Sequence, residues 1–138
     1  MEHELHELAN DTNEKQDKII YKDLSFQIME AIFEVHNILG PGYTENIYEE
    51  ALARELENRQ ISYQRQKLIE VLYKNSKIGE YKLDMIVDSK IILELKAVSQ
   101  LNDLFQAQIL SYLKATKIKL GILVNFGKDR IEYKRIDY

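Results

Sequence analysis

Three charged residues stand in or beside a mostly apolar stretch of the sequence: Asp84, Glu94 and Lys96. Glu94 interrupts an apolar run over 91–95, and strand alternation places Glu94 and Lys96 on one face of their strand. Spacing alone favours an ordinary solvated pair on an edge hairpin, because E-x-K is a common tripeptide. Placement favours function, because a strand so apolar is typical of a sheet centre, where an unpartnered carboxylate is costly.

The loop before Glu94 decides which residue faces it across the hairpin. If Val87 pairs with Ile91 around a three-residue loop, Asp84 lies directly opposite Glu94. A two-residue loop would instead mix apolar and charged residues on both faces. The first register is therefore predicted, with one uniformly apolar face made by the opposed pairs Leu83–Leu95 and Met85–Leu93.

Two carboxylates at opposed strand positions predict a cation between them. Opposed residues lie about 4.5–5.5 Å apart at Cβ, and like charges there destabilise a sheet. An ion of the Mg²⁺ class takes oxygen ligands and keeps several waters, so Asp84 and Glu94 could supply its protein ligands. Lys96 could then orient or help deprotonate a water, or neutralise charge growing on a phosphate. This is an arrangement for phosphodiester hydrolysis.

Hydrophobic periodicity predicts the elements that position these residues. Apolar steps of three and four predict helices over about 24–39, 47–58 and 101–113, the first ending at Gly40-Pro41-Gly42. Alternation and β-branched residues predict strands over about 62–73, 77–87, 90–97, 118–125 and 129–137. The first three read as an antiparallel meander and 118–125 as a buried central strand. The order ααβββαββ indicates an α/β chain with a mixed sheet flanked by helices.

Composition narrows the classes of protein. The polar segment 1–17 is expected to be disordered, and 18–138 to form a single domain. With no cysteine, any metal must be held by oxygen or histidine, and a net charge of −4 argues against a general polyanion binder. Nucleic-acid contact would therefore be local. No apolar run approaches a membrane span, so we expect a cytoplasmic protein without membrane contact; self-association is left open.

Several motifs together resemble one protein family. Gly42 to Tyr48 reads G-x-x-E-x-x-Y, which is similar to the motif that names the GxxExxY family of small bacterial proteins. A single such motif is weak, but five further segments agree with the family in order and spacing from about residue 20 to the end. The other matching segments are Glu34-Val35-His36, Leu39–Gly42, Leu93-Glu94-Leu95-Lys96-Ala97, Gln108–Lys114 and Gly121–Gly127.

The resemblance implies a restriction-endonuclease-like fold, because the family is placed in the PD-(D/E)xK nuclease superfamily, near the RecB-like nucleases. It implies catalytic roles for Asp84, Glu94 and Lys96, with Mg²⁺ or Mn²⁺ as cofactor. Glu45 becomes an accessory acid and, with Asp84 and Glu94, a metal ligand. From the residues alone, Glu45 reads as an acid favoured at a helix N-terminus by the helix dipole.

Three further residues have two readings each. By resemblance, Gln108 and Tyr112 form the helix motif that follows E-x-K, and their i, i+4 spacing puts them on one face, where they could orient Lys96 or a phosphate. A half-buried amide and a core-edge tyrosine are equally plausible. His36 is a candidate additional metal ligand, because histidine joins the metal in some RecB-like nucleases, or a hydrogen-bonded boundary histidine.

Two functions of different classes follow. The first is a metal-dependent nuclease that hydrolyses nucleic acid, with DNA as the expected partner. The alternative is a catalytically silent nuclease-fold protein that binds nucleic acid or protein as a regulatory module. A metal hydrolase acting on another phosphate ester remains a third reading, because ligands alone do not name a substrate.

Overall fold

The computed structural model describes residues 19–138, so the expectation of disorder over 1–17 lies outside the described part. Two helices, α2 (Lys22–Leu39) and α3 (Glu45–Asn58), precede a three-stranded meander. The remaining elements are the meander strands β1 (Tyr63–Tyr73), β2 (Ser76–Val87) and β3 (Ile91–Lys96), then α4 (Asp103–Thr116), β4 (Leu120–Asn125) and β5 (Glu132–Asp137). The predicted order ααβββαββ is confirmed, with bounds within a few residues of the expected ones.

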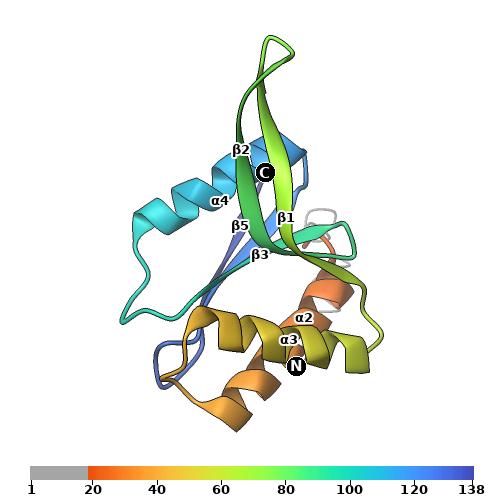
Figure 1. The fold of residues 1–138 in the computed structure, drawn as a ribbon. Helices are drawn as coiled ribbons and strands as arrows, with labels where there is room; N and C mark the ends of the chain where they lie inside the picture. The colour runs from red at the N-terminus through yellow and green to blue at the C-terminus, as the bar shows by residue number, and fades with distance from the viewer. Residues whose placement is uncertain (1–18) are drawn as a thin grey trace.

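The five strands form one mixed sheet in the order β1-β2-β3-β4-β5. Neighbouring strands are antiparallel except β3 and β4, which run parallel because α4 carries the chain back between them. All six residues of β4 are buried, as its apolar run predicted. The hairpin of β1 and β2 extends well beyond the other strands (Figure 1).

Two separate cores cover the two faces of the sheet. On one face, α2 and α3 pack on alternate residues of β3 and β4, including Leu93, Leu95 and Ile122. On the other, α4 packs on the residues between them, including Ile92 and Leu123. The alternation predicted for β3 is therefore confirmed, and Glu94 and Lys96 belong to the face that α4 covers.

The turn between α2 and α3 is fixed by the residues of the G-x-x-E-x-x-Y motif. Gly40 and Gly42 have positive φ angles of 70° and 117°, a conformation that glycine adopts at little cost. The buried Tyr48 hydroxyl donates a 2.5 Å hydrogen bond to the Gly40 carbonyl and accepts one from the Tyr43 N–H. Its ring stacks on Phe126, with centroids 4.5 Å apart. The tyrosine of the motif thus ties the start of α3 to the end of β4.

One detail of the predicted hairpin is wrong. The register itself is confirmed, with Val87 opposite Ile91 and Met85 opposite Leu93. Leu83, however, packs in the α4 core, whereas Leu95 packs under α2 and α3, so the two do not share a face. The cause is a change of face within β2 near Asp84, which simple alternation does not foresee.

Candidate active site

Asp84 and Glu94 meet where the backbone ladder between β2 and β3 stops. The ladder ends at the pair Met85–Leu93. Beyond it, the Asp84 N–H donates to Glu94 Oε1 over 3.0 Å, and the Leu95 N–H donates to Asp84 Oδ2 over 2.8 Å. Each carboxylate thus takes the place that a ladder carbonyl would fill. The predicted juxtaposition of the two acids is what the structure shows.

Ionisation of both Asp84 and Glu94 is electrostatically unfavourable. Glu94 is only 4% exposed. Burial, followed by the charge of Asp84, raises the pKa of Glu94 to about 8. Burial also raises the pKa of Asp84, and the nearby charges of Glu49 and Glu45 add to the increase. The site favours whatever neutralises these acids, either a proton or a cation.

Lys96 supplies a positive charge close to Asp84 and Glu94. It opposes the rise in the pKa of both Glu94 and Asp84, so its field reaches the pair. Its Nζ lies 4.4 Å from the centre of the Phe105 ring, an attractive cation–π contact with α4. Its carbonyl accepts a 2.8 Å hydrogen bond from the Phe126 N–H. The ammonium is therefore held on the α4 side of the strand.

Glu45 is placed near the pair but does not complete a ligand cluster. It is the exposed first residue of α3, and its charge contributes to the raised pKa values of Asp84 and Glu94. Within residues 19–138, no three His, Cys, Asp or Glu side chains are arranged to hold a metal ion. The preassembled donors are therefore Asp84 and Glu94. Two carboxylates suit Mg²⁺, which binds through one or two of them and keeps waters or substrate phosphates as its other ligands.

Gln108 and Tyr112, the two residues of the motif on α4, have different surroundings. Tyr112 is buried; burial first, and then the charges of Glu94 and Asp84, raise the pKa of its hydroxyl. Tyr112 also contacts Tyr81 edge-on, with ring centroids 4.9 Å apart. Gln108 is exposed, and its backbone carbonyl accepts a hydrogen bond from the Ser111 hydroxyl. Tyr112 therefore lies within the electrostatic reach of the acids, whereas Gln108 faces outward.

His36 occupies a hydrogen-bonded position at the boundary of the core. It is 7% exposed, and its Nε2 lies 2.9 Å from the Lys128 carbonyl. Its ring lies beside Phe126, with centroids 6.2 Å apart. Within the described residues, no hydrogen bond or ion pair joins His36 to Asp84 or Glu94. These contacts match the expectation of a hydrogen-bonded boundary histidine.

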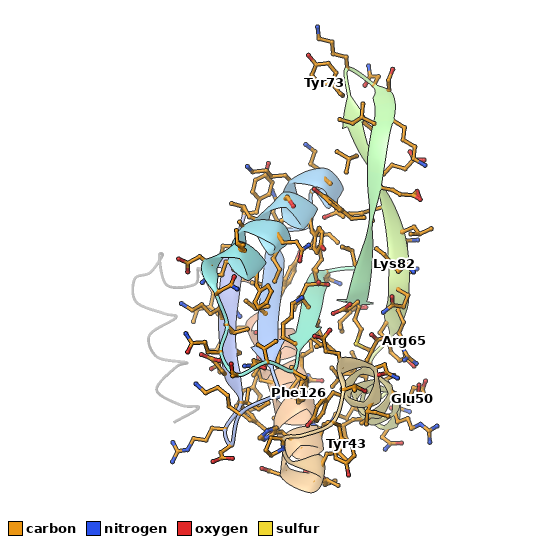
Figure 2. The ribbon with its side chains drawn as sticks, turned by 60° about the vertical axis from the view of Figure 1, so that its left-hand side comes forward. Tyr43, Glu50, Arg65, Tyr73, Lys82 and Phe126 are labelled. Atoms are coloured by element: carbon orange, nitrogen blue, oxygen red, sulfur yellow. The ribbon has the colours of Figure 1, made fainter. Side chains whose placement is uncertain are left out.

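Glu49, which is buried one turn after Glu45 on α3, is a further acid near the pair that the sequence pattern does not indicate. It bonds Arg65 and Gln66 of β1 and lies near Asp84. Figure 2 shows Arg65 between Glu50 of α3 and Lys82 of the hairpin. The i, i+4 spacing of Glu45 and Glu49 could have indicated a shared helix face. Nothing local distinguished Glu49 from its exposed neighbour Glu50, however.

Comparisons with known proteins identify the fold and the superfamily of this chain. The model of the PD-(D/E)XK nuclease superfamily matches residues 22–136. The fold is also similar to that in the crystal structure of SSO0001, with a TM-score of 0.53 at 19% identity over 99% of this chain and 74% of that chain. A search of curated protein sequences gave no significant match. The five-stranded mixed sheet flanked by helices is restriction-endonuclease-like, and the chain belongs to the PD-(D/E)XK nuclease superfamily.

The helices of the described part show no membrane-spanning character. Within residues 19–138, none combines the length and the apolar composition that crossing a bilayer requires.

Proposed function

We propose that this protein is a metal-dependent nuclease that hydrolyses phosphodiester bonds at Asp84, Glu94 and Lys96. The observation that carries the proposal is the exchange of hydrogen bonds between Asp84, Glu94 and the two strand backbones. This exchange holds the buried Glu94 and the partly buried Asp84 side by side, where burial and their like charges oppose ionisation of both. Nucleases of this superfamily generally use divalent metals, and Mg²⁺ or Mn²⁺ fits a site with two preassembled carboxylates.

Each residue has a role that follows from its position. Asp84 and Glu94 would hold the cation, which would supply Lewis-acid stabilisation of the phosphoryl oxygens and acidify water. Lys96 would stabilise negative charge on the phosphate from the α4 side. Glu45, near but outside the pair, would join as an accessory ligand through its exposed side chain. Tyr112 would hold its hydroxyl proton and serve as a hydrogen-bond donor.

The charge distribution supports local contact with nucleic acid. The first 18 residues contain six acids and two lysines, which accounts for the whole net charge of −4. The remainder of the chain is neutral by composition and so does not repel a polyanion overall. We propose DNA as the substrate class, bound through contacts near the site instead of through a broad basic surface.

A nuclease assay with matched variants tests the proposal. Single- and double-stranded DNA and RNA are incubated with the full chain in Mg²⁺, Mn²⁺ or EDTA. Glu94→Gln and Lys96→Met should each lower cleavage by at least about a hundredfold, because each removes a group that acts at the reacting phosphate. Glu70→Gln, an exposed change on β1, should leave the rate unchanged. Cleavage that persists in Glu94→Gln at the wild-type rate would place the activity elsewhere.

The absence of a third preassembled ligand within residues 19–138 favours one rival, a silent nuclease-fold module that binds nucleic acid or protein. Binding of a labelled oligonucleotide without cleavage, in every metal tested, would support that rival over the enzyme.

A further inference from the structure

Gln66 has an unusual backbone conformation within β1. Its φ is +48°, in the left-handed region that L residues rarely adopt, although it lies inside a strand. The pairs on either side of it, Arg65–Met85 and Lys67–Leu83, keep one register, so no residue is inserted. Gln66 therefore lies opposite Asp84. Strained conformations of this kind persist only where the surrounding structure holds them.

Both strands of the hairpin change faces at this level. On β1, Tyr63 packs against the α2–α3 core, whereas Ile69 packs against the α4 core, although an even separation should place them on one face. On β2, Met85 packs in the α2–α3 core and Leu83 in the α4 core, although these residues are also two positions apart. The change of face falls between Tyr63 and Ile69 on one strand and at Asp84 on the other. We call this feature the crossover, defined by Gln66 and Asp84.

Glu49 of α3 holds the β1 side of the crossover. It is only 6% exposed, and both of its carboxylate oxygens are used. Oε1 accepts from Gln66 Nε2 and Oε2 accepts from Arg65 Nε, each over 2.9 Å. The adjacent Glu50 accepts from Arg65 Nη1 over the same distance, but its side chain is 48% exposed and does not bond Gln66. Glu49 is thus the member of the acidic pair that reaches the strained residue.

We propose that Glu49, acting through Gln66, is a positioning residue for the carboxylate of Asp84. The crossover places the Asp84 side chain between the strands, where Oδ2 accepts from the Leu95 N–H. Without the bond from Glu49, Gln66 would relax toward ordinary strand geometry, and Asp84 would lose its hold on Leu95. The expected effect of Glu49 on metal binding rests on the proposed function, in which Asp84 is a metal ligand.

Amide hydrogen exchange measured by NMR in EDTA tests the geometry without any metal. In Glu49→Ala, the Leu95 amide should exchange at least about tenfold faster, while the Ile122 amide of β4 reports global stability and should change far less. Gln66→Gly should remain near wild type, because glycine adopts positive φ at little cost. The double variant Glu49→Ala/Gln66→Gly should regain most of the protection. Glu50→Ala is the matched control and should have no effect.

Mn²⁺ affinity measured on the same five proteins tests the consequence. Loss of a residue that orients a metal ligand typically weakens binding about 10–100-fold, so Glu49→Ala should fall in that range, and Gln66→Gly in the same chain should restore affinity. A purely structural role for Glu49 would not predict rescue by glycine.

The outcomes separate this inference from the proposed function. Equal acceleration of the Leu95 and Ile122 amides in Glu49→Ala would overturn the positioning role, as would a double variant no better than Glu49→Ala. If the exchange pattern holds but the wild-type protein neither binds Mn²⁺ nor cleaves nucleic acid, the positioning role stands and the proposed function fails.

Discussion

The free energy of unfolding of the metal-free protein should fall as pH rises through neutrality. In the folded state the pKa of Glu94 is about 8, against an ordinary value of 4.5. Between these values the unfolded chain has released a proton that the folded protein still binds. The contribution of Glu94 to the free energy of unfolding is therefore fully present below pH 4.5 and is lost as the pH rises toward 8. The raised pKa of Asp84 acts in the same direction.

The expected change in the free energy of unfolding with pH is large enough to measure. A full proton difference changes the free energy of unfolding by about 1.36 kcal/mol per pH unit, so Glu94 alone accounts for roughly 2–3 kcal/mol between pH 5.5 and 7.5. With a urea dependence of about 1–3 kcal/mol per molar, the unfolding midpoint should drop by roughly 1–3 M over that range. Glu94→Gln should remove most of the slope, because an amide does not titrate in this range. The amide oxygen can still accept from the Asp84 N–H, so the local structure is kept.

Urea unfolding followed by circular dichroism in EDTA at several pH values provides the assay. Glu70→Gln, exposed on β1, should keep the wild-type slope. At pH 7.5, Mg²⁺ should raise the midpoint of the wild type but not of Glu94→Gln, since a ligand stabilises only the state that binds it. A wild-type midpoint that is flat or rises from pH 5.5 to 7.5 would refute the reasoning, as would a Glu94→Gln slope equal to that of the wild type.

Three packing changes give further tests by thermal unfolding. Gly127→Ala should destabilise by about 1–3 kcal/mol, because an added Cβ would lie 2.4 Å from the Val98 carbonyl oxygen, where the loops after β3 and β4 meet. Tyr48→Phe should cost about 1–3 kcal/mol, because it leaves the Gly40 carbonyl without its hydroxyl donor while keeping the stacked ring. Leu83→Ala should cost about 2–5 kcal/mol, since this fully buried side chain fills part of the α4 core.

The element order and the central register were predictable because they follow from local periodicity and loop length. The apolar alternation around Glu94 had one register that left Met85 opposite Leu93, and the structure has that register. Gly40 and Gly42 marked the end of the first helix for the same local reason, since their positive φ angles need no tertiary contact to be foreseen.

The crossover was not predictable, because it depends on a contact between distant elements. Gln66 looks like any polar residue of a strand, and its conformation is held by Glu49, 17 positions earlier in the chain. Leu83, next to Asp84 on the opposed strand, packs in the α4 core although strand alternation would place it on the face of Met85. Helical spacing places Gln108 and Tyr112 on one side of α4 but does not say how much of that side is buried, and only Tyr112 is buried.

The site combines features that each oppose stability: two acids held together, burial of Glu94, and a left-handed residue inside a strand. Buried charge and backbone strain are retained in proteins mainly where function requires them. If a cation is what relieves the acids, a change that stabilises the metal-free fold should also abolish the response to metal. Glu94→Gln is the variant in which both effects must appear together at neutral pH. Burial of Glu94 alone would give the gain in stability without any response to metal, so the loss of the metal response in the same variant is the result that would identify a cation as the partner of these acids.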